Sequence, residues 1–142
     1  MRNLLCFLVI TTAASVFAGD LRLEDESFST MAYIREDGRI EDASFRTLGY
    51  IIDGSRVEDS SFNTLGYIRD GRIEGSSFNT MYYLEDDGRL TDASFNTILY
   101  ISGDGTVEDR SFNTMLYTDG SDPELNVHVT AYLVFFSDMM PE

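Results

Sequence analysis

The residue types that most often perform covalent catalysis are scarce in this chain. Its only histidine is His128 and its only cysteine is Cys6. Serine catalysis needs a hydroxyl that a neighbouring base activates, and a lone histidine with no fixed partner does not supply that arrangement. The serines instead recur at a regular spacing together with asparagines, which indicates hydrogen bonding in turns. They are Ser27, Ser44, Ser61, Ser77, Ser94 and Ser111, with Asn63, Asn79, Asn96 and Asn113. We therefore predict no catalytic residue and a non-enzymatic protein.

Carboxylates are abundant enough to consider glycoside hydrolysis. That reaction needs two carboxyl groups about 5 to 9.5 Å apart in different environments. The acidic residues here recur with one period, so each is expected to be a solvated equivalent of the next. The recurring residues are Glu41, Glu58, Glu74 and Glu108, with Asp42, Asp59, Asp92 and Asp109. No position is singled out, and no acid–base pair is predicted.

Calcium binding is a stronger alternative, because acidic turns supply the oxygen ligands that Ca²⁺ prefers. Two such stretches are Glu85-Asp86-Asp87-Gly88 and Asp119-Gly120-Ser121-Asp122. Neither has the spacing of an EF-hand loop or of the calcium-binding nonapeptide repeat. Turn formation is a sufficient reason for Asp-Gly at these positions. We predict no intrinsic metal site and no cofactor, and adventitious surface binding of calcium stays open.

Aromatic residues recur with the same period and permit two interpretations. A series of exposed rings can stack on sugars, which makes a carbohydrate- or peptide-binding module the alternative function. The same rings can instead form the core. The pattern favours a core built from the recurring phenylalanines and tyrosines, and it leaves Tyr82, which is outside the register, as an exposed aromatic. The recurring tyrosines are Tyr33, Tyr50, Tyr67, Tyr83, Tyr100 and Tyr117.

The period itself defines the architecture. Six Ser-Phe pairs, from Ser27-Phe28 to Ser111-Phe112, are spaced by 17, 17, 16, 17 and 17 residues. Regular self-similarity of this kind is typical of repeat folds. The complete repeats are residues 28–44, 45–61, 62–77, 78–94 and 95–111.

Each repeat reads as a β-hairpin, because aromatic and β-branched residues flank an Asp-Gly turn. The tips are Asp37-Gly38, Asp53-Gly54, Asp70-Gly71, Asp87-Gly88 and Asp104-Gly105. The repeat that is one residue shorter predicts a two-residue turn that opposes Ile68 to Ile73, and the first repeat predicts a three-residue turn that opposes Ile34 to Ile40. Alternation places Ala32, Ile34 and Ile40 on one face.

The two ends of the repeat region complement one another. Residues 21–28 resemble the second half of a repeat and residues 114–120 resemble the first half. We predict that these halves pair and close an all-β, pseudo-symmetric ring of about five hairpins. Residues 125–136 are apolar and partly alternating, which predicts a C-terminal strand that pairs with repeat backbone and seals the ring. A strand that mediates oligomerisation is the alternative.

The repeated phrase, of which "SFNTLGYIRDGRIEGSSF" is one copy, resembles the five-fold β-flower proteins, as does the apolar "TAYLVFF" segment. The resemblance covers residues 19–142, which we treat as one repeat domain. It implies a ring of about five hairpin petals in a small secreted protein, and it implies no particular activity.

Residues 1–18 have the features of a secretory signal peptide: a basic start, a short apolar run and small residues ending at Ala18. Export to the periplasm or the medium is therefore expected. The formal charge is −15 and every basic residue is an arginine. Such a charge disfavours nucleic acids and anionic lipid surfaces. We expect a soluble monomer that does not insert into membranes and whose partner, if any, is a glycan or a protein.

Overall fold

The computed structural model describes residues 19–120, 122 and 124–141. The predicted signal peptide lies outside the described residues. Within them the chain forms twelve strands followed by one helix, α1 (Leu125–Phe136). The strands are β1 (Leu21–Glu24), β2 (Thr30–Ile34), β3 (Arg39–Asp42), β4 (Thr47–Ile52), β5 (Arg56–Asp59), β6 (Thr64–Arg69), β7 (Arg72–Gly75), β8 (Thr80–Leu84), β9 (Arg89–Asp92), β10 (Thr97–Ile101), β11 (Thr106–Asp109) and β12 (Thr114–Asp119).

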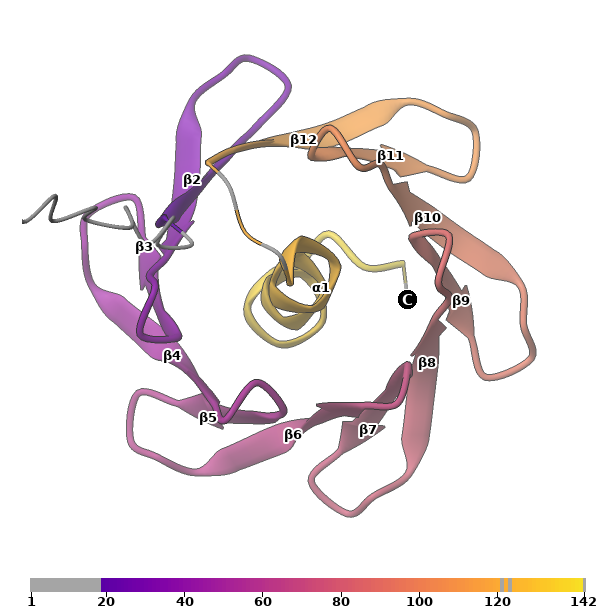
Figure 1. The fold of residues 1–142 in the computed structure, drawn as a ribbon, viewed down its shortest axis with the longest axis horizontal. Coiled ribbons are helices and arrows are strands. Elements are labelled where there is room, and N and C mark those ends of the chain that lie inside the picture. Colours follow the sequence, from indigo (N-terminus) through magenta and orange to yellow (C-terminus); the bar gives the residue numbers. More distant parts are fainter. Residues whose placement is uncertain (1–18, 121, 123, 142) are drawn as a thin grey trace, which may run out of the picture.

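The twelve strands form one closed antiparallel barrel in which every strand pairs with its two neighbours (Figure 1). Five strand pairs are the complete repeats of the sequence. The sixth pair is β1 with β12, where Leu23 lies opposite Thr118. The predicted pairing of the two half-repeats is thus confirmed, and it leaves the sheet without a free edge.

Turn length sets the register of each hairpin as expected. Ile34 lies opposite Ile40 and Ile68 lies opposite Ile73. The short repeat turns in two residues, Asp70 and Gly71, whose φ angles are 53° and 72°. A two-residue hairpin turn of this type requires positive φ at both positions, and Asp-Gly tolerates that conformation well.

A β-bulge recurs where the second strand of each repeat meets the next repeat. Val57 pairs with Gly66 and Glu58 pairs with Thr64, so Leu65 has no partner residue. The same shift occurs at all six of these junctions. A bulge increases local twist and bends the strand. Its repetition helps a narrow sheet to curve into a closed barrel.

The barrel interior is lined by the apolar face that alternation predicts. Ala32, Ile34 and Ile40 are 2 % exposed or less, and their counterparts in the other repeats line the same core. Tyr82 occupies the position of Ala32 in its repeat and packs against this core. Its predicted exposure is therefore wrong: the residue replaces a small inward side chain with a large one.

The C-terminal segment is a helix, and the predicted strand at 125–136 is wrong. Figure 1 shows α1 in the middle of the ring. Both edges of every strand are already paired, so a further strand inside the barrel would find no backbone partners. A helix satisfies its own N–H and C=O groups, and helix geometry therefore overrides the β-branched composition of this segment.

The middle of α1 is buried on all sides inside the barrel, since the five consecutive residues from Val129 to Leu133 are all buried. Val129 and Leu133 are fully buried. A Cβ added to Gly66 would lie 2.6 Å from Cζ of Phe135, and one on Gly49 would lie 2.5 Å from Cζ of Phe136. These glycines make room for the helix. In the described part of the chain, no helix has the length and apolar character needed to cross a membrane.

Candidate functional site

Among the residues that the structure describes, the six recurring phenylalanines are the most exposed large apolar side chains. Their exposed fractions lie between 57 % and 65 %. They are Phe28, Phe45, Phe62, Phe78, Phe95 and Phe112. The prediction that they form the core is wrong, because the loop that carries each phenylalanine lies outside the strand alternation from which the inward side was assigned.

Each exposed phenylalanine stacks on a half-buried recurring tyrosine. The ring centroids are 4.7 to 5.1 Å apart and the ring planes differ by 12° to 18°. The pairs are Phe28–Tyr117, Tyr33–Phe45, Tyr50–Phe62, Tyr67–Phe78, Tyr83–Phe95 and Tyr100–Phe112. The tyrosines therefore belong to the outer surface of the barrel, and the prediction that they are core residues is also wrong. We call these six pairs the aromatic stacks.

The loop that presents each phenylalanine has an unusual backbone. All six have φ between 62° and 65°, in the left-handed region that bulky residues rarely adopt. In the Phe62 loop, Oδ1 of Asp59 accepts hydrogen bonds from the N–H groups of Ser61 and Asn63 at 2.8 and 3.0 Å. The Asn63 amide donates to Oδ2 of Asp59 at 3.0 Å. The loop is thus held by one aspartate, whose carboxylate accepts hydrogen bonds from the backbone of Ser61 and from the backbone and side chain of Asn63.

These hydrogen bonds also affect acid–base behaviour. Donation from the side chain and the N–H of Asn63 holds the pKa of Asp59 below its usual value. The same arrangement lowers the pKa values of Asp92 and Asp109. The pKa of Asp42 is also lowered, and there the largest cause is the hydrogen bond from the backbone N–H of Arg46. The structural role predicted for the asparagines therefore holds for Asn63, Asn96 and Asn113.

Two of the six stacks are covered by an arginine of the same repeat. The guanidinium carbon of Arg35 lies 4.6 Å from the ring centroid of Tyr33 and 5.8 Å from that of Phe45. In the third repeat, Arg69 lies 5.0 Å from Tyr67. Sequence reasoning missed these arginines. The sequence signal that could have identified them is variation between repeats. The position of Arg35 holds Arg, Ile, Arg, Glu, Ser and Asp in successive repeats, whereas the stacked rings are the same in all six.

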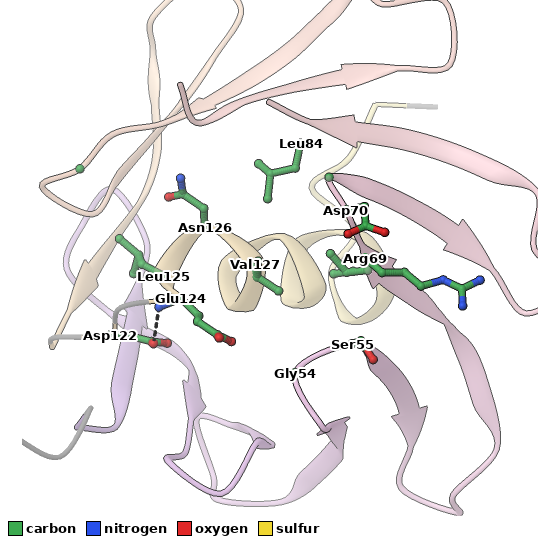
Figure 2. Close-up of a pocket in the computed structure, with 13 residues that line it drawn as sticks. Gly54, Ser55, Arg69, Asp70, Leu84, Asp122, Glu124, Leu125, Asn126 and Val127 are labelled. Carbon is green, nitrogen blue, oxygen red and sulfur yellow. Dashed lines mark hydrogen bonds between the residues drawn. The ribbon is translucent and has the colours of Figure 1, made fainter. Parts of the chain in front are cut away.

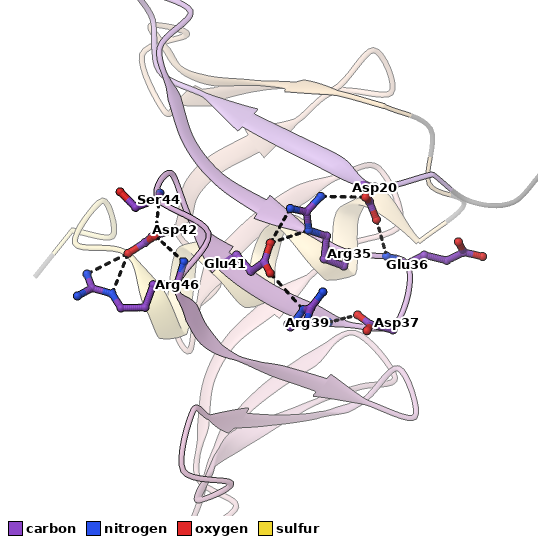
Figure 3. A network of polar contacts seen from close by, with 9 residues as sticks. All are labelled: Asp20, Arg35, Glu36, Asp37, Arg39, Glu41, Asp42, Ser44 and Arg46. Atoms are coloured by element: carbon purple, nitrogen blue, oxygen red, sulfur yellow. Dashed lines mark hydrogen bonds and ion pairs between the residues drawn. The ribbon is translucent and has the colours of Figure 1, made fainter.

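Carboxylates hold the arginine of the first repeat in place, as Figure 3 shows for Glu41 and Asp20 around Arg35. Nε of Arg35 donates to Oε2 of Glu41 at 2.6 Å, and Arg35 also donates to Asp20 at 2.9 Å. Glu41, Glu58 and Glu74 are buried, with exposed fractions of 8 % or less. The expectation that these glutamates are solvated is wrong, because each lies opposite a half-buried tyrosine and pairs with arginine.

A separate pocket of about 580 Å³ opens where α1 begins (Figure 2). Hairpin tips line one side, including Gly54 and Asp70, and the start of α1 lines the other, including Asn126 and Val127. Several tips therefore share one rim around the helix, as the equal phase of the repeats predicts. Unlike the aromatic stacks, this pocket combines polar groups that are not repeat equivalents.

His128 lies near this pocket and has fixed partners, contrary to the sequence interpretation. Its Nδ1 contacts Oδ2 of Asp122, and its Nε2 lies 3.6 Å from Oε2 of Glu124. In the described part of the chain both contacts at its ring nitrogens are carboxylates. The arrangement fixes the start of α1, since Asp122 also accepts a hydrogen bond from the N–H of Glu124 at 2.8 Å.

The acidic turns do not converge on an ion. Among the residues that the structure describes, no group of three or more histidine, cysteine, aspartate or glutamate side chains could hold a metal. Ser121 of the second acidic stretch lies outside those residues.

Comparison with known proteins gives one match. A search of curated proteins and of solved structures finds no match to the chain. The family model described as "5-fold beta-flower protein" matches residues 20–136, a range that contains every strand from β1 onward and the whole of α1. This match and the ring of repeated hairpins place the chain in the family of 5-fold beta-flower proteins.

Proposed function

We propose that this protein is an exported, non-enzymatic interaction module that binds its partner through the aromatic stacks. The observation that carries the proposal is the exposure of six phenylalanines in left-handed backbone conformation. Bulky residues adopt this conformation at a cost of about 1–2 kcal/mol each. Strained residues that recur on a surface support a role beyond folding.

The chemistry of the aromatic stacks fits ligand binding. Each stack offers a flat apolar surface on which a sugar ring or a peptide side chain can lie, with loop carboxylates beside it. Six copies around one barrel favour multivalent binding, in which weak individual contacts combine. The non-enzymatic part of the proposal is supported by the surroundings of His128: both of its ring nitrogens face carboxylates, so neither is placed to accept a proton from a nucleophilic hydroxyl.

Arrays of glycans and peptides, probed with the mature protein, test the proposal. The variant replaces all six recurring phenylalanines with asparagine, which tolerates left-handed backbone and removes the ring. The control replaces with alanine the six recurring serines, each of which lies one residue before a phenylalanine. We expect the asparagine variant to lose array binding and the control to retain it. Equal binding by both variants, at equal folded fraction, would refute the proposal.

A further inference from the structure

We propose that the aromatic stack of Tyr83 and Phe95 binds the guanidinium group of an arginine side chain from a partner. The inference rests on the proposed function, because it assigns a ligand class to one of the aromatic stacks. Its basis is a comparison between repeats of this chain, in which the protein's own arginines cover two equivalent stacks.

The first repeat shows how such a stack holds a guanidinium. Arg35 lies over Tyr33, and carboxylates of Glu41 and Asp20 accept its hydrogen bonds (Figure 3). A cation over an aromatic face is attracted by the negative potential of the ring. Carboxylates at the edge of the ring complete the site through charge-assisted hydrogen bonds.

The fourth repeat has the same framework without the arginine. Its ring centroids are 4.7 Å apart with a 15° angle between the planes, close to the 5.1 Å and 18° of the first repeat. The turn is also the same: the N–H of Glu85 donates to O of Arg89 at 2.8 Å, as the N–H of Arg35 donates to O of Arg39. Glu85 therefore occupies the position from which Arg35 extends.

A carboxylate is already present where the first repeat has Asp20. Arg22 pairs with Tyr33 and Arg72 pairs with Tyr83, so strand register places Asp70 in the fourth repeat where Asp20 lies in the first. Asp70, Glu85 and Asp86 line a cavity of about 260 Å³ together with the rings of Tyr83 and Phe95. This charge favours a cation.

A second, independent feature is an unpartnered polar atom beside the stack. Thr91 lies opposite Tyr83, in the place of Glu41 opposite Tyr33. Thr91 is 1 % exposed, and its Oγ1 is buried without a hydrogen-bond partner in the described part of the chain. A buried hydroxyl without a partner is unfavourable. In the first repeat the residue at this position is Glu41, whose carboxylate accepts from the guanidinium of Arg35.

The arrangement of carboxylates and aromatic rings around the cavity favours one kind of cation. Its carboxylates are not grouped in a way that could hold a metal ion, as judged from the described residues. A planar guanidinium can stack on the rings and reach more than one carboxylate at once, which a compact ammonium does less well. The occupant is therefore an arginine side chain of a cationic peptide or protein, attracted by a chain of formal charge −15.

NMR titration with N-acetyl-arginine methylamide tests this assignment, and the citrulline analogue, of nearly the same shape and uncharged, is the control ligand. We expect the arginine compound to shift the ring signals of Tyr83 and Phe95 and to bind about tenfold more tightly than the citrulline compound, a preference within the range for a cation–aromatic contact. Equal binding of the two compounds, or shifts confined to other residues, would overturn the assignment.

Two variants sharpen the test. Glu85→Arg supplies an internal guanidinium, as in the first repeat, and should abolish binding at the Tyr83–Phe95 stack without loss of thermal stability. The control variant is Glu36→Gln. Glu36 is an exposed carboxylate in the first repeat, at the position that Asp86 has in the fourth, and its replacement should leave binding at the Tyr83–Phe95 stack unchanged. Undiminished binding to the Glu85→Arg variant would refute the inference. Array binding that depends on phenylalanine but shows no preference for arginine would refute this inference and leave the proposed function standing.

Discussion

The exposed phenylalanines have a stabilising contact and a strained backbone at the same residue. Stacking on tyrosine contributes about 0.5–1.5 kcal/mol. Phe62→Ala should therefore lower the free energy of unfolding by about 1 kcal/mol, and Phe62→Gly should cost less because glycine relieves the left-handed strain. Ile73, which is fully buried, provides the contrast: Ile73→Ala should cost about 2–5 kcal/mol. Urea denaturation of the three variants measures the difference, and a larger loss for Phe62→Ala than for Ile73→Ala would contradict it.

The loop aspartates make stability depend on pH in a defined window. Hydrogen bonds from Asn63 lower the pKa of Asp59 below its usual value, so folding favours the ionised carboxylate. Its contribution is fully present above about pH 4 and is lost as pH falls through the lowered folded-state value. We expect Asp59→Ala to be less stable than the wild type at neutral pH, and the difference to shrink below pH 4. Thermal unfolding across pH 2 to 7 checks this, and a difference independent of pH would count against it.

At the scale of elements, two strand glycines determine how closely α1 approaches the sheet. A Cβ on Gly66 would lie 2.2 Å from the carbonyl oxygen of Glu74 and 2.6 Å from the ring of Phe135. Gly66→Ala should therefore destabilise the protein by about 1–3 kcal/mol through overpacking. Gly103→Ala is the control, because no atom lies within 4 Å of its added Cβ. Chemical denaturation should separate the two variants, and equal stabilities would show that the helix adjusts freely.

Some features of the strands and loops can be predicted from the sequence and others cannot. Hairpin register followed from alternation and turn length, so the pairing of Ile34 with Ile40 could be read from the sequence. The bulge at Leu65 and its counterparts could not, because it adds a residue without changing the apolar character of the strand. The outward position of the phenylalanines is not predictable from alternation, because they lie in loops between strands, where alternation does not assign a face.

The C-terminal segment shows a different limit. Its β-branched residues favour a strand, as at Val127, Val129 and Thr130. The deciding fact is global: a closed barrel has no vacant strand edge, and only a helix can satisfy its backbone inside it. Closure of the ring thus determines the helical conformation of the C-terminal segment.

At the scale of the whole molecule, α1 is the core on which the barrel depends. Deleting residues 125–142 would expose the apolar interior to water, and we expect the truncated chain to unfold or aggregate. Leu133 is fully buried, and Leu133→Ala should cost about 2–5 kcal/mol, whereas Leu133→Met should cost less than about 1.5 kcal/mol. Size-exclusion chromatography and circular dichroism test the deletion. A folded, monomeric truncated protein would show that the strands alone are sufficient.

The pairing of β1 with β12 also has a consequence for biogenesis. Arg22 and Asp119, joined by a hydrogen bond across the β1–β12 pair, are separated by 97 positions, and α1 follows β12 in the chain. The barrel cannot close, and its interior cannot be filled, until nearly all of the polypeptide has emerged. Early hairpins can form locally, because their contacts are short-range. Completion of the native state is therefore coupled to completion of the polypeptide itself.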